Sequence, residues 1–443
     1  MIGFGSVGQG LLPLFLSAFS VHPSQIRIIA ADDNGLIAAN YLGVSHTLLP
    51  LTPSNYSDVL ARHLQDGDLL INLSVNVSSV ALITWCKAND VLYLDTCVEP
   101  WANGYTIEDS ITLASTNAWL RRQALSLFEP GAATAIIAHG MNPGLISHFV
   151  KAALRSLASR KNISVDQTPS WGELASLLGV RAVHIVERDT QDDNQSLQYG
   201  EFVNTWSAEG LYSEAWLQKS EVFWGSSEDF FPGEAQSTTH NNALRLTKNG
   251  ANIQVKSWTP SLGEQNGILV THHEVISIGE LLYTADYSPT VGYVYNPSLK
   301  AKASLRNLQL GQPVTHFRVM NSPTLQGFDE VGVLLVHETG SLWHGTTLNC
   351  SEARRLVPFN NATSLQVVAG VIAALTWMFD NPRAGVVEAE SLDSEKVLDI
   401  ARPYLGKVSM VETDWRPDTG AGFSGVLATH VEQFESSQQI EKA

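Results

Sequence analysis

The chain opens on Gly3-Phe4-Gly5-Ser6-Val7-Gly8, in which three glycines have the spacing G-x-G-x-x-G, and a mostly apolar stretch follows. Glycine at these places permits a tight turn, brings the backbone close to a pyrophosphate and lets a helix pack on the preceding strand. The N-terminus of that helix also faces the phosphate charge. The pattern therefore predicts a dinucleotide site contacted by Gly3, Gly5, Ser6, Val7 and Gly8.

A second β-rich run, 26–29, lies about 20 residues further on and leads through two alanines to Asp32 and Asp33. In dinucleotide-binding folds, an acid after the second strand holds the adenine ribose. We expect Asp32 to be this acid, with Asp33 as the alternative, because the strand runs into the alanines first. Only Met1 and Ile2 precede the first glycine, so we expect most of the first strand to lie upstream of the printed sequence.

The composition is that of a globular protein large enough for at least two domains: 443 residues, of which 44% are hydrophobic and 16% charged. It has no continuous apolar run of membrane-spanning length and no signal-peptide pattern, so we expect a soluble protein without a membrane partner. Three cysteines, Cys86, Cys97 and Cys350, fit neither a disulfide framework nor a zinc spacing. These features favour the cytoplasm.

Acidic residues outnumber basic ones by 44 to 27, which gives a net charge of −17. A charge of this sign opposes binding to nucleic acid and attracts small cations. Solubility alone is the competing interpretation, because net charge does not say where the charges lie.

The first part of the chain alternates strand-like and helical patterns. Segments 68–73, 91–95 and 135–138 read as buried strands and 79–88 as a helix. This alternation predicts an α/β fold with a Rossmann-type, doubly wound parallel sheet. We assign it to residues 1–150.

Strand-like segments follow one another after about residue 160. They predict an inserted α+β domain with a mixed or antiparallel sheet, residues 151–359, for substrate binding and dimerisation. Its expected strands are 182–187, 253–258, 267–271, 281–287, 291–295, 331–337 and 342–348. A helical stripe from Thr363 to a stop at Asn381-Pro382 predicts that 360–405 returns to the first domain. The C-terminal segment, 406–443, has a polar end that we expect to be frayed.

Three predicted strands of the first domain end in polar residues, where an open α/β sheet binds its ligands. The residues are Asn72, Leu73 and Ser74, then Asp95 and Thr96, then Asn142. Helix capping and turn formation are the alternative at each place. For Asn142 we also expect an N-cap, with Pro143 as the first residue of a helix over 145–157. Three such ends after a glycine fingerprint favour a ligand crevice.

Carboxylates and aromatic residues recur together along the chain, at Glu99 before Trp101, at Glu209 after Trp206, and near Trp224. Carboxylates bind ammonium groups, and an indole face attracts a cation by about 0.5–2 kcal/mol. This pairing suits a cationic amine. For any single tryptophan, core packing is the alternative.

The sequence His272-His273-Glu274 lacks the spacing of a helical zinc site, and no cysteine cluster could complete one, so we expect no metal. His272 is instead a candidate general acid or base, because imidazole titrates near neutrality.

Several of these segments together resemble bacterial homospermidine synthases, within the wider saccharopine dehydrogenase-like group. The resemblance spans nearly the whole chain. The segments are 3–8, 95–101, 142–144, 187–191, 202–207, 269–272 and 361–367. The resemblance implies a homodimeric, NAD-dependent transferase that joins two putrescines into homospermidine with loss of ammonia, or makes homospermidine from putrescine and spermidine by amine transfer.

The resemblance also implies roles for individual residues. Trp224 would hold an ammonium group, with Glu209, Glu99 and Asp329 anchoring amines. His272 and Asn142 would lie near the reacting carbon. Two alternatives stay open: a net reductase like saccharopine or carboxynorspermidine dehydrogenase, and a non-catalytic NAD and polyamine sensor. Reductase substrates carry a carboxylate and call for an arginine, and Arg188 is the one guanidinium near these motifs.

Overall fold

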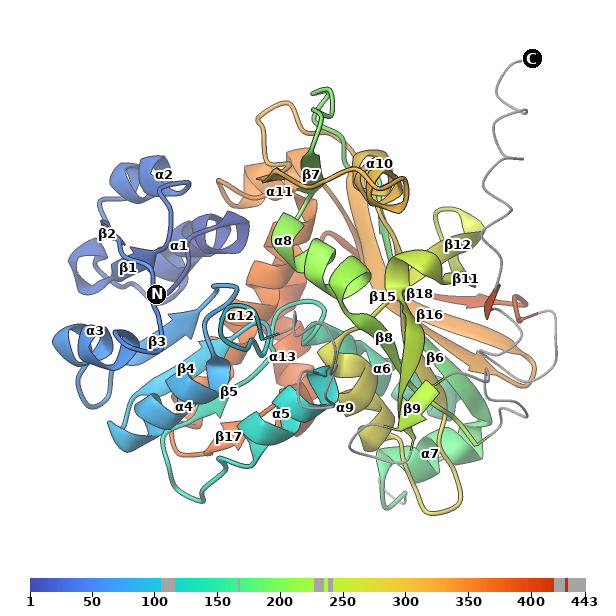
Figure 1. Ribbon diagram of the computed structural model, residues 1–443. Coiled ribbons are helices and arrows are strands. Elements are labelled where there is room, and N and C mark those ends of the chain that lie inside the picture. The colour runs from blue at the N-terminus through green and yellow to red at the C-terminus, as the bar shows by residue number, and fades with distance from the viewer. Residues whose placement is uncertain (105–115, 166–167, 227–234, 238–241, 418–426, 429–443) are drawn as a thin grey trace.

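A computed structural model describes residues 1–104, 116–165, 168–226, 235–237, 242–417 and 427–428 (Figure 1). Its first sheet contains parallel strands in the order β17-β5-β4-β3, and β1 pairs in parallel with β2. Ile2 forms parallel bridges to Ile29 and Asn72 and so connects the two sets. The strands are β1 (Arg27–Ala30), β2 (Ser45–Leu48), β3 (Leu69–Asn72), β4 (Leu92–Asp95), β5 (Ala135–Ile136) and β17 (Val386–Val387). Across the bridge at Ile2 the parallel strands therefore run in the order β2-β1-β3-β4-β5-β17, which confirms the predicted doubly wound sheet.

The helices that cover this sheet begin where the sequence supplies caps. Ser78 accepts a hydrogen bond from Ala81 N–H at the start of α4, and Thr116 accepts one from Trp119 N–H at the start of α5. The helices are α1 (Ser6–Ala18), α2 (Leu36–Tyr41), α3 (Tyr56–His63), α4 (Ser79–Ala88) and α5 (Asn117–Leu125).

The helix α12 (Ala362–Asp380) packs against α1 and lies between the two sheets (Figure 1). Asn361 caps it by accepting a hydrogen bond from Ser364 N–H. Within the described residues it is the helix long and apolar enough to cross a membrane, but 78% of its apolar window is buried inside the protein. We therefore interpret α12 as the core helix that joins the two halves of the molecule.

A large mixed sheet forms the second half, which confirms the predicted sheet type. Its main path is β18-β16-β15-β6-β13-β12-β11-β19, with β13 and β6 parallel. Its strands are β6 (Val180–Asp189), β8 (Lys219–Phe223), β9 (Ala235–Ser237), β10 (Ala243–Asn249), β11 (Gln254–Thr259), β12 (Gly263–Val270), β13 (Thr290–Asn296), β15 (Phe328–His337), β16 (Gly340–Asn349), β18 (Lys407–Thr413) and β19 (Leu427–Ala428).

Further helices pack around this sheet, and a short parallel pair, β7 (Glu201–Asn204) with β14 (His316–Val319), lies apart from it. After β7 the chain forms α8 (Ala208–Leu211), which continues into a π-helical turn over Tyr212–Leu217. The other helices are α6 (Leu145–Arg160), α7 (Trp171–Leu178), α9 (His273–Leu281), α10 (Leu299–Gln309), α11 (Cys350–Leu356) and α13 (Ser394–Ala401).

Two local predictions are wrong. The segment 281–287 is not a strand, because α9 extends to Leu281 and a turn in which Thr284 N–H donates to Tyr287 C=O follows. Asn142 is not the N-cap of α6, because a tight turn closes first and Gly144, at φ 126°, takes that place. The predicted frayed end lies outside the described residues.

Candidate active site

A cavity of about 960 Å³, part of it open to solvent, lies between the carboxyl ends of the first sheet and the large sheet. On one side, Asn72 is the last residue of β3, Ser74 lies just beyond it, and Thr96 follows β4. On the other side, Glu187 and Asp329 project from β6 and β15. The cavity therefore lies where an open α/β sheet binds ligands, and the second half of the molecule closes it.

The charged side chains lining the cavity are of one sign. Among the described lining residues, four are carboxylates and none is a lysine or an arginine. The four are Glu99, Glu187, Glu214 and Asp329. Such a lining favours a cationic ligand, because carboxylates withdrawn from water are costly unless a cation is paired with them.

Buried lining atoms without a hydrogen-bond partner also favour a cationic ligand. Five side-chain oxygens of lining residues are buried and have no hydrogen-bond partner within the described chain: Asn142 Oδ1, Glu187 Oε1, Glu214 Oε2, Asp329 Oδ1 and Gln366 Oε1. An unsatisfied buried acceptor costs about 1–3 kcal/mol. All five are acceptors, so a ligand rich in N–H donors would satisfy them.

Glu187 and Asp329 are held in place by neighbours that leave one oxygen of each free. Tyr293 OH donates to Glu187 Oε2 at 2.7 Å, and Asn142 Nδ2 lies 3.4 Å from the same oxygen. Thr363 Oγ1 donates to Asp329 Oδ2 at 2.8 Å. Burial and the negative charge of Asp189 raise the pKa of Glu187, and burial raises the pKa of Asp329 well above its usual range. Both carboxyl groups are thus favoured in the protonated form in the absence of a cation, and a bound cation would favour their ionised form.

A second group of titratable side chains lies nearer the first domain. Burial raises the pKa of Glu214 to about 7, although His272 acts in the opposite direction. Burial also raises the pKa of Glu99 to about 7. The pKa of His272 is lowered by burial, and Glu214 partly offsets this. Glu214 and Glu99 can therefore exchange protons near neutral pH, which is what amine and imine chemistry requires.

The aromatic wall differs from the one predicted. Trp206 lines the cavity, and its ring centroid lies 6.5 Å from that of Tyr295. The Trp224 side chain instead packs in an apolar cluster with Val222 and Leu246 and is 9% exposed. Because Trp224 is absent from the described lining, the structure gives Trp206 the position from which an indole could contact a bound cation.

The predicted acid Glu209 also lies elsewhere: it is exposed on α8, while Gly210 and Glu214 line the cavity. Of the six predicted substrate or acid–base residues, the structure brings four together at the cavity, namely Glu99, Asn142, His272 and Asp329, and it has Glu214 there in place of Glu209. Sequence reasoning assigned no role to Glu187, Glu214 or Gln366. The available signal was a charged residue directly after the mostly apolar run 182–186, because such residues are seldom buried without a partner or a function.

The predicted cofactor residues form the first-domain face. Val7, Asn72, Leu73, Ser74 and Thr96 line the cavity. Gly3 has φ 78°, and a side chain there would meet the Leu73 backbone at 2.7 Å. A side chain on Gly5 would meet no atom within 4 Å, which leaves an open cradle beside the N-terminus of α1. These residues fit a bound dinucleotide pyrophosphate.

The other predicted cofactor residues lie around this face. Ser6 and Gly8 are in the first turns of α1. Asp32 is exposed beyond β1 and accepts a hydrogen bond from Asn34 N–H, so its side chain is accessible to a ribose. Asp95 is fully buried and accepts hydrogen bonds from Ala138 N–H at 2.6 Å and Tyr93 OH at 2.7 Å. Asp95 therefore organises the ends of β4 and β5 from beneath.

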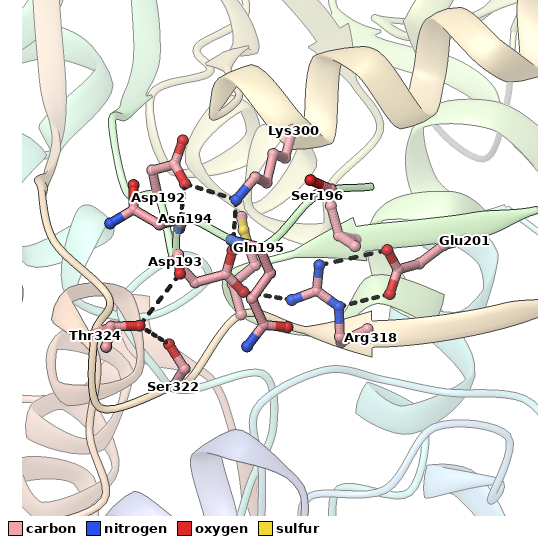
Figure 2. Close-up of polar contacts among 12 residues, drawn as sticks. Asp192, Asp193, Asn194, Gln195, Ser196, Glu201, Lys300, Arg318, Ser322 and Thr324 are labelled. Carbon is pink, nitrogen blue, oxygen red and sulfur yellow. Dashed lines mark hydrogen bonds and ion pairs between the residues drawn. The ribbon is translucent and has the colours of Figure 1, made fainter. Parts of the chain in front are cut away.

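An ion-pair cluster fixes the segment that leads to Trp206 (Figure 2). Lys300 Nζ lies 2.6 Å from both Asp192 and Asp193, and Arg318 bridges Asp193 and Glu201. These contacts tie the connection between β6 and β7 to α10 and β14. They therefore fix the start of the segment 201–217, which carries Trp206 and Glu214 to the cavity.

Comparisons with known proteins cover nearly the whole chain. Residues 1–136 match the saccharopine dehydrogenase NADP binding domain, and residues 140–412 match the saccharopine dehydrogenase C-terminal domain. The homospermidine synthase of Blastochloris viridis is 39% identical over 441 residues, which cover 95% of this chain and 92% of that protein. The homospermidine synthase of Mesorhizobium japonicum is 37% identical over 439 residues, which cover 94% and 90%.

Solved structures agree with these matches. The crystal structure of homospermidine synthase from Legionella pneumophila in complex with NAD superimposes with a TM-score of 0.89 at 38% identity and covers 97% of both chains. Apo saccharopine dehydrogenase from Saccharomyces cerevisiae superimposes with a TM-score of 0.51 at 10% identity, over 93% of this chain and 98% of that one. The second likeness is one of fold.

Proposed function

We propose a reaction for this chain from one premise: it belongs to the homospermidine synthase family, within the saccharopine dehydrogenase group. It is an NAD-dependent enzyme of the transferase class. Its reaction joins two putrescines into homospermidine and releases ammonia, or transfers the aminobutyl group of spermidine to putrescine and releases 1,3-diaminopropane.

The single observation that carries this proposal is the lining of the cavity. Its described charged groups are four carboxylates, and its unpaired buried polar atoms include five acceptor oxygens. A diamine supplies what is missing, since each ammonium carries three N–H donors and a positive charge. Its apolar carbon chain can lie against Trp206 and Val331.

We assign the ends of the diamine to separate carboxylates. Glu187 and Asp329, on neighbouring strands of the large sheet, bind the ammonium that stays unreacted. Glu214 and His272 lie where the reacting amine would meet the first-domain face, and Glu99 lies on that face. Trp206 stabilises the cationic amine, because an indole attracts cations by about 0.5–2 kcal/mol.

The first-domain face holds NAD through the glycine turn, Asn72, Ser74 and Thr96, with Asp32 toward the ribose. Bound there, the nicotinamide supplies hydride removal from the amine-bearing carbon and hydride return to the condensed imine. Glu214 and His272 hold the proton that an ammonium loses before oxidation and return it to the departing ammonia. The cavity walls limit water, which would hydrolyse an imine.

The lining argues against a net reductase as the second candidate. Amino-acid substrates of such enzymes carry a carboxylate, and Arg188 does not reach the described lining: its guanidinium donates to Ser261 Oγ at 2.7 Å and lies over the Phe328 ring. A non-catalytic sensor would bind the same ligands without turning them over, so an assay of turnover separates it from the enzyme.

We also propose that the enzyme is a cytoplasmic homodimer that binds neither nucleic acid nor membranes. The family resemblance supports the dimer. The three cysteines are free, which suits a reducing compartment, and the net charge of −17 opposes nucleic acid.

The test is turnover by purified protein with putrescine and catalytic NAD. We expect homospermidine and ammonia in equal amounts, measured by mass spectrometry and an ammonia assay. Glu187→Gln serves as the site variant, and the exposed Glu209→Gln serves as the matched control because Glu209 lies outside the cavity lining. Tight binding of putrescine and NAD without any product would contradict the enzyme and favour the sensor.

A further inference from the structure

A buried ion cluster connects the first domain to α9, the helix that begins directly after His272. Helices α5 and α9 lie beside each other (Figure 1). Arg121, in α5, has a side chain only 7% exposed. Its Nε and Nη2 donate to the two carboxylate oxygens of Glu388 at 2.7 and 2.5 Å, and its Nη1 donates to Glu280 Oε2 at 2.6 Å. The guanidinium thus satisfies two carboxylates at once.

Both ends of α9 are reached by this cluster. Glu280 lies in the last turn of α9, while Glu388 follows β17 of the first sheet. The Glu388 Oε2 atom also lies 3.4 Å from Nε2 of His273, the first residue of α9. Arg121 therefore holds the C-terminal turn of α9 directly and its N-terminal turn through Glu388 and His273.

The residue on the other side of His272 is held by the same helix α5. Asn117 Nδ2 donates to Thr271 Oγ1 at 3.2 Å, and Asn117 N–H donates to Glu221 Oε2 at 3.0 Å. Thr271 Oγ1 donates to that same Glu221 oxygen at 3.2 Å. Both neighbours of His272 in the chain are consequently held by α5, Thr271 through Asn117 and His273 through Glu388 and Arg121.

The chemistry of the cluster suits a fixed geometry. An arginine presents its donors in a planar fork, so a bidentate pair with a carboxylate sets orientation as well as distance. The Arg121 guanidinium and His273 hold the pKa of Glu388 at about 2 in spite of its burial, so this carboxylate stays ionised. Lysine at the same place would keep the charge and lose the fork.

We propose that Arg121 is a positioning residue that sets the location of His272 relative to the strand ends that hold NAD. It acts through Glu388 and His273 and touches neither substrate nor cofactor. The inference rests on the proposed function, because it concerns the proton transfers assigned to His272. A displacement of a reacting group by about 1 Å can lower a rate by roughly 100-fold.

Steady-state kinetics of Arg121→Lys and Arg121→Met test this inference. We expect kcat to fall by about 10–100-fold in Arg121→Met and by less in Arg121→Lys, with NAD affinity and the KM for putrescine within about 2-fold of wild type. The control is Arg383→Met, because Arg383 is exposed and pairs with Asp90 far from the cavity lining. Rates are divided by the fraction of protein that binds NAD, so misfolded protein does not count as a positioning effect.

A second readout is independent of turnover. In protein labelled with ¹³C on histidine, the signal of His272 is identified by its loss in His272→Gln. We expect Arg121→Met to move the signals of His272 and His273 and to change the titration of His272. The signal of the exposed His22 should stay in place. If Arg121→Met does not fold, Glu388→Gln breaks the same ion pair from the other side, because it removes the negative charge of Glu388 and keeps its shape, and we expect the same result.

The outcomes separate the two claims. Wild-type protein that fails to make homospermidine contradicts the proposed function, and the histidine signals still decide the positioning of His272. An unchanged His272 titration in a folded variant overturns the inference. So does a loss of kcat that disappears once rates are divided by the NAD-binding fraction.

Discussion

The two faces of the cavity use different physical means to bind their ligands. The first-domain face presents backbone, small side chains and neutral polar groups such as Asn72, Ser74 and Thr96, and its glycine turn leaves open space. The opposite face presents Glu187 near the end of β6 and Asp329 at the start of β15, both buried. One face is therefore stable without its ligand, whereas the other carries buried acceptors that the N–H donors of a cationic amine would satisfy.

The largest effect should come from closing the open space on the first-domain face. In Gly5→Val, the branched side chain meets no atom of the protein within 4 Å of its Cβ position, so the fold tolerates it, but it occupies the place of the pyrophosphate. We expect NAD affinity to fall by at least about 100-fold with an unchanged melting temperature. Cofactor titration checks this, and unchanged NAD affinity would place the nucleotide elsewhere.

Glu187→Gln should weaken the reaction of the amine at the opposite face. The amide keeps the shape and removes the charge, so we expect kcat/KM for putrescine to fall by about 100-fold, or about 3 kcal/mol for a charged hydrogen bond. NAD affinity should not change. Because a carboxylate with an unpaired oxygen is removed, the ligand-free variant should be as stable as wild type or more so. A thermal melt and amine kinetics measure both; a variant that loses stability and keeps its amine affinity would show that Glu187 serves the fold.

The carboxyl groups of the opposite face should also make the stability of the protein depend on pH. The pKa of Glu187 is raised by burial from its ordinary 4.5 to about 8 in the folded protein. Its protonated form therefore stabilises the fold fully below pH 4.5, and this stability is lost as the pH rises toward about 8. We expect the melting temperature of ligand-free protein to fall by roughly 2–4 °C across that range. Putrescine, or the Glu187→Gln substitution, should flatten the slope, and an equal slope in the variant would contradict the assignment.

The smallest effect concerns the aromatic wall. Trp206→Ala should weaken amine turnover by about 3–30-fold, and Trp206→Phe by less, because a benzene face keeps part of the cation attraction of about 0.5–2 kcal/mol. Trp224→Phe is the matched control and should lower the melting temperature without a selective effect on amines, since Trp224 packs in an apolar cluster. Equal losses in the two Trp206 variants would assign Trp206 to packing.

Sequence reasoning succeeded best where function depends on the backbone. The glycine turn, the alternation of strands and helices, and the polar strand ends that line the cavity all follow from local pattern. It could not choose between tryptophans, because Trp206 and Trp224 stand in similar local sequence and only the tertiary arrangement places one at the cavity and the other in the core.

Dependence on tertiary arrangement also explains why the local sequence did not identify Glu187 and Glu214 as cavity residues. Glu209 and Glu214 are five residues apart, and the π-helical turn over Tyr212–Leu217 decides which of them lines the cavity. The pairing of Glu187 with Asp329 depends on the register of β6 against β15, which brings together residues far apart in the chain. Asn142 was placed near the reacting carbon by resemblance, while its local pattern indicated a helix cap that the turn at Gly144 takes instead.

The central claim is that NAD on one face and a diamine on the other complete a closed redox cycle. Putrescine deuterated at both amine-bearing carbons tests it most directly, with unlabelled NADH added to the solution and the product analysed by mass spectrometry. We predict homospermidine that keeps all its deuterium, with no NADH accumulating, because the transferred deuterium stays on the bound cofactor until it returns. Product that has lost one deuterium, a requirement for added NADH, or its release in step with turnover would contradict the account and favour a net dehydrogenase.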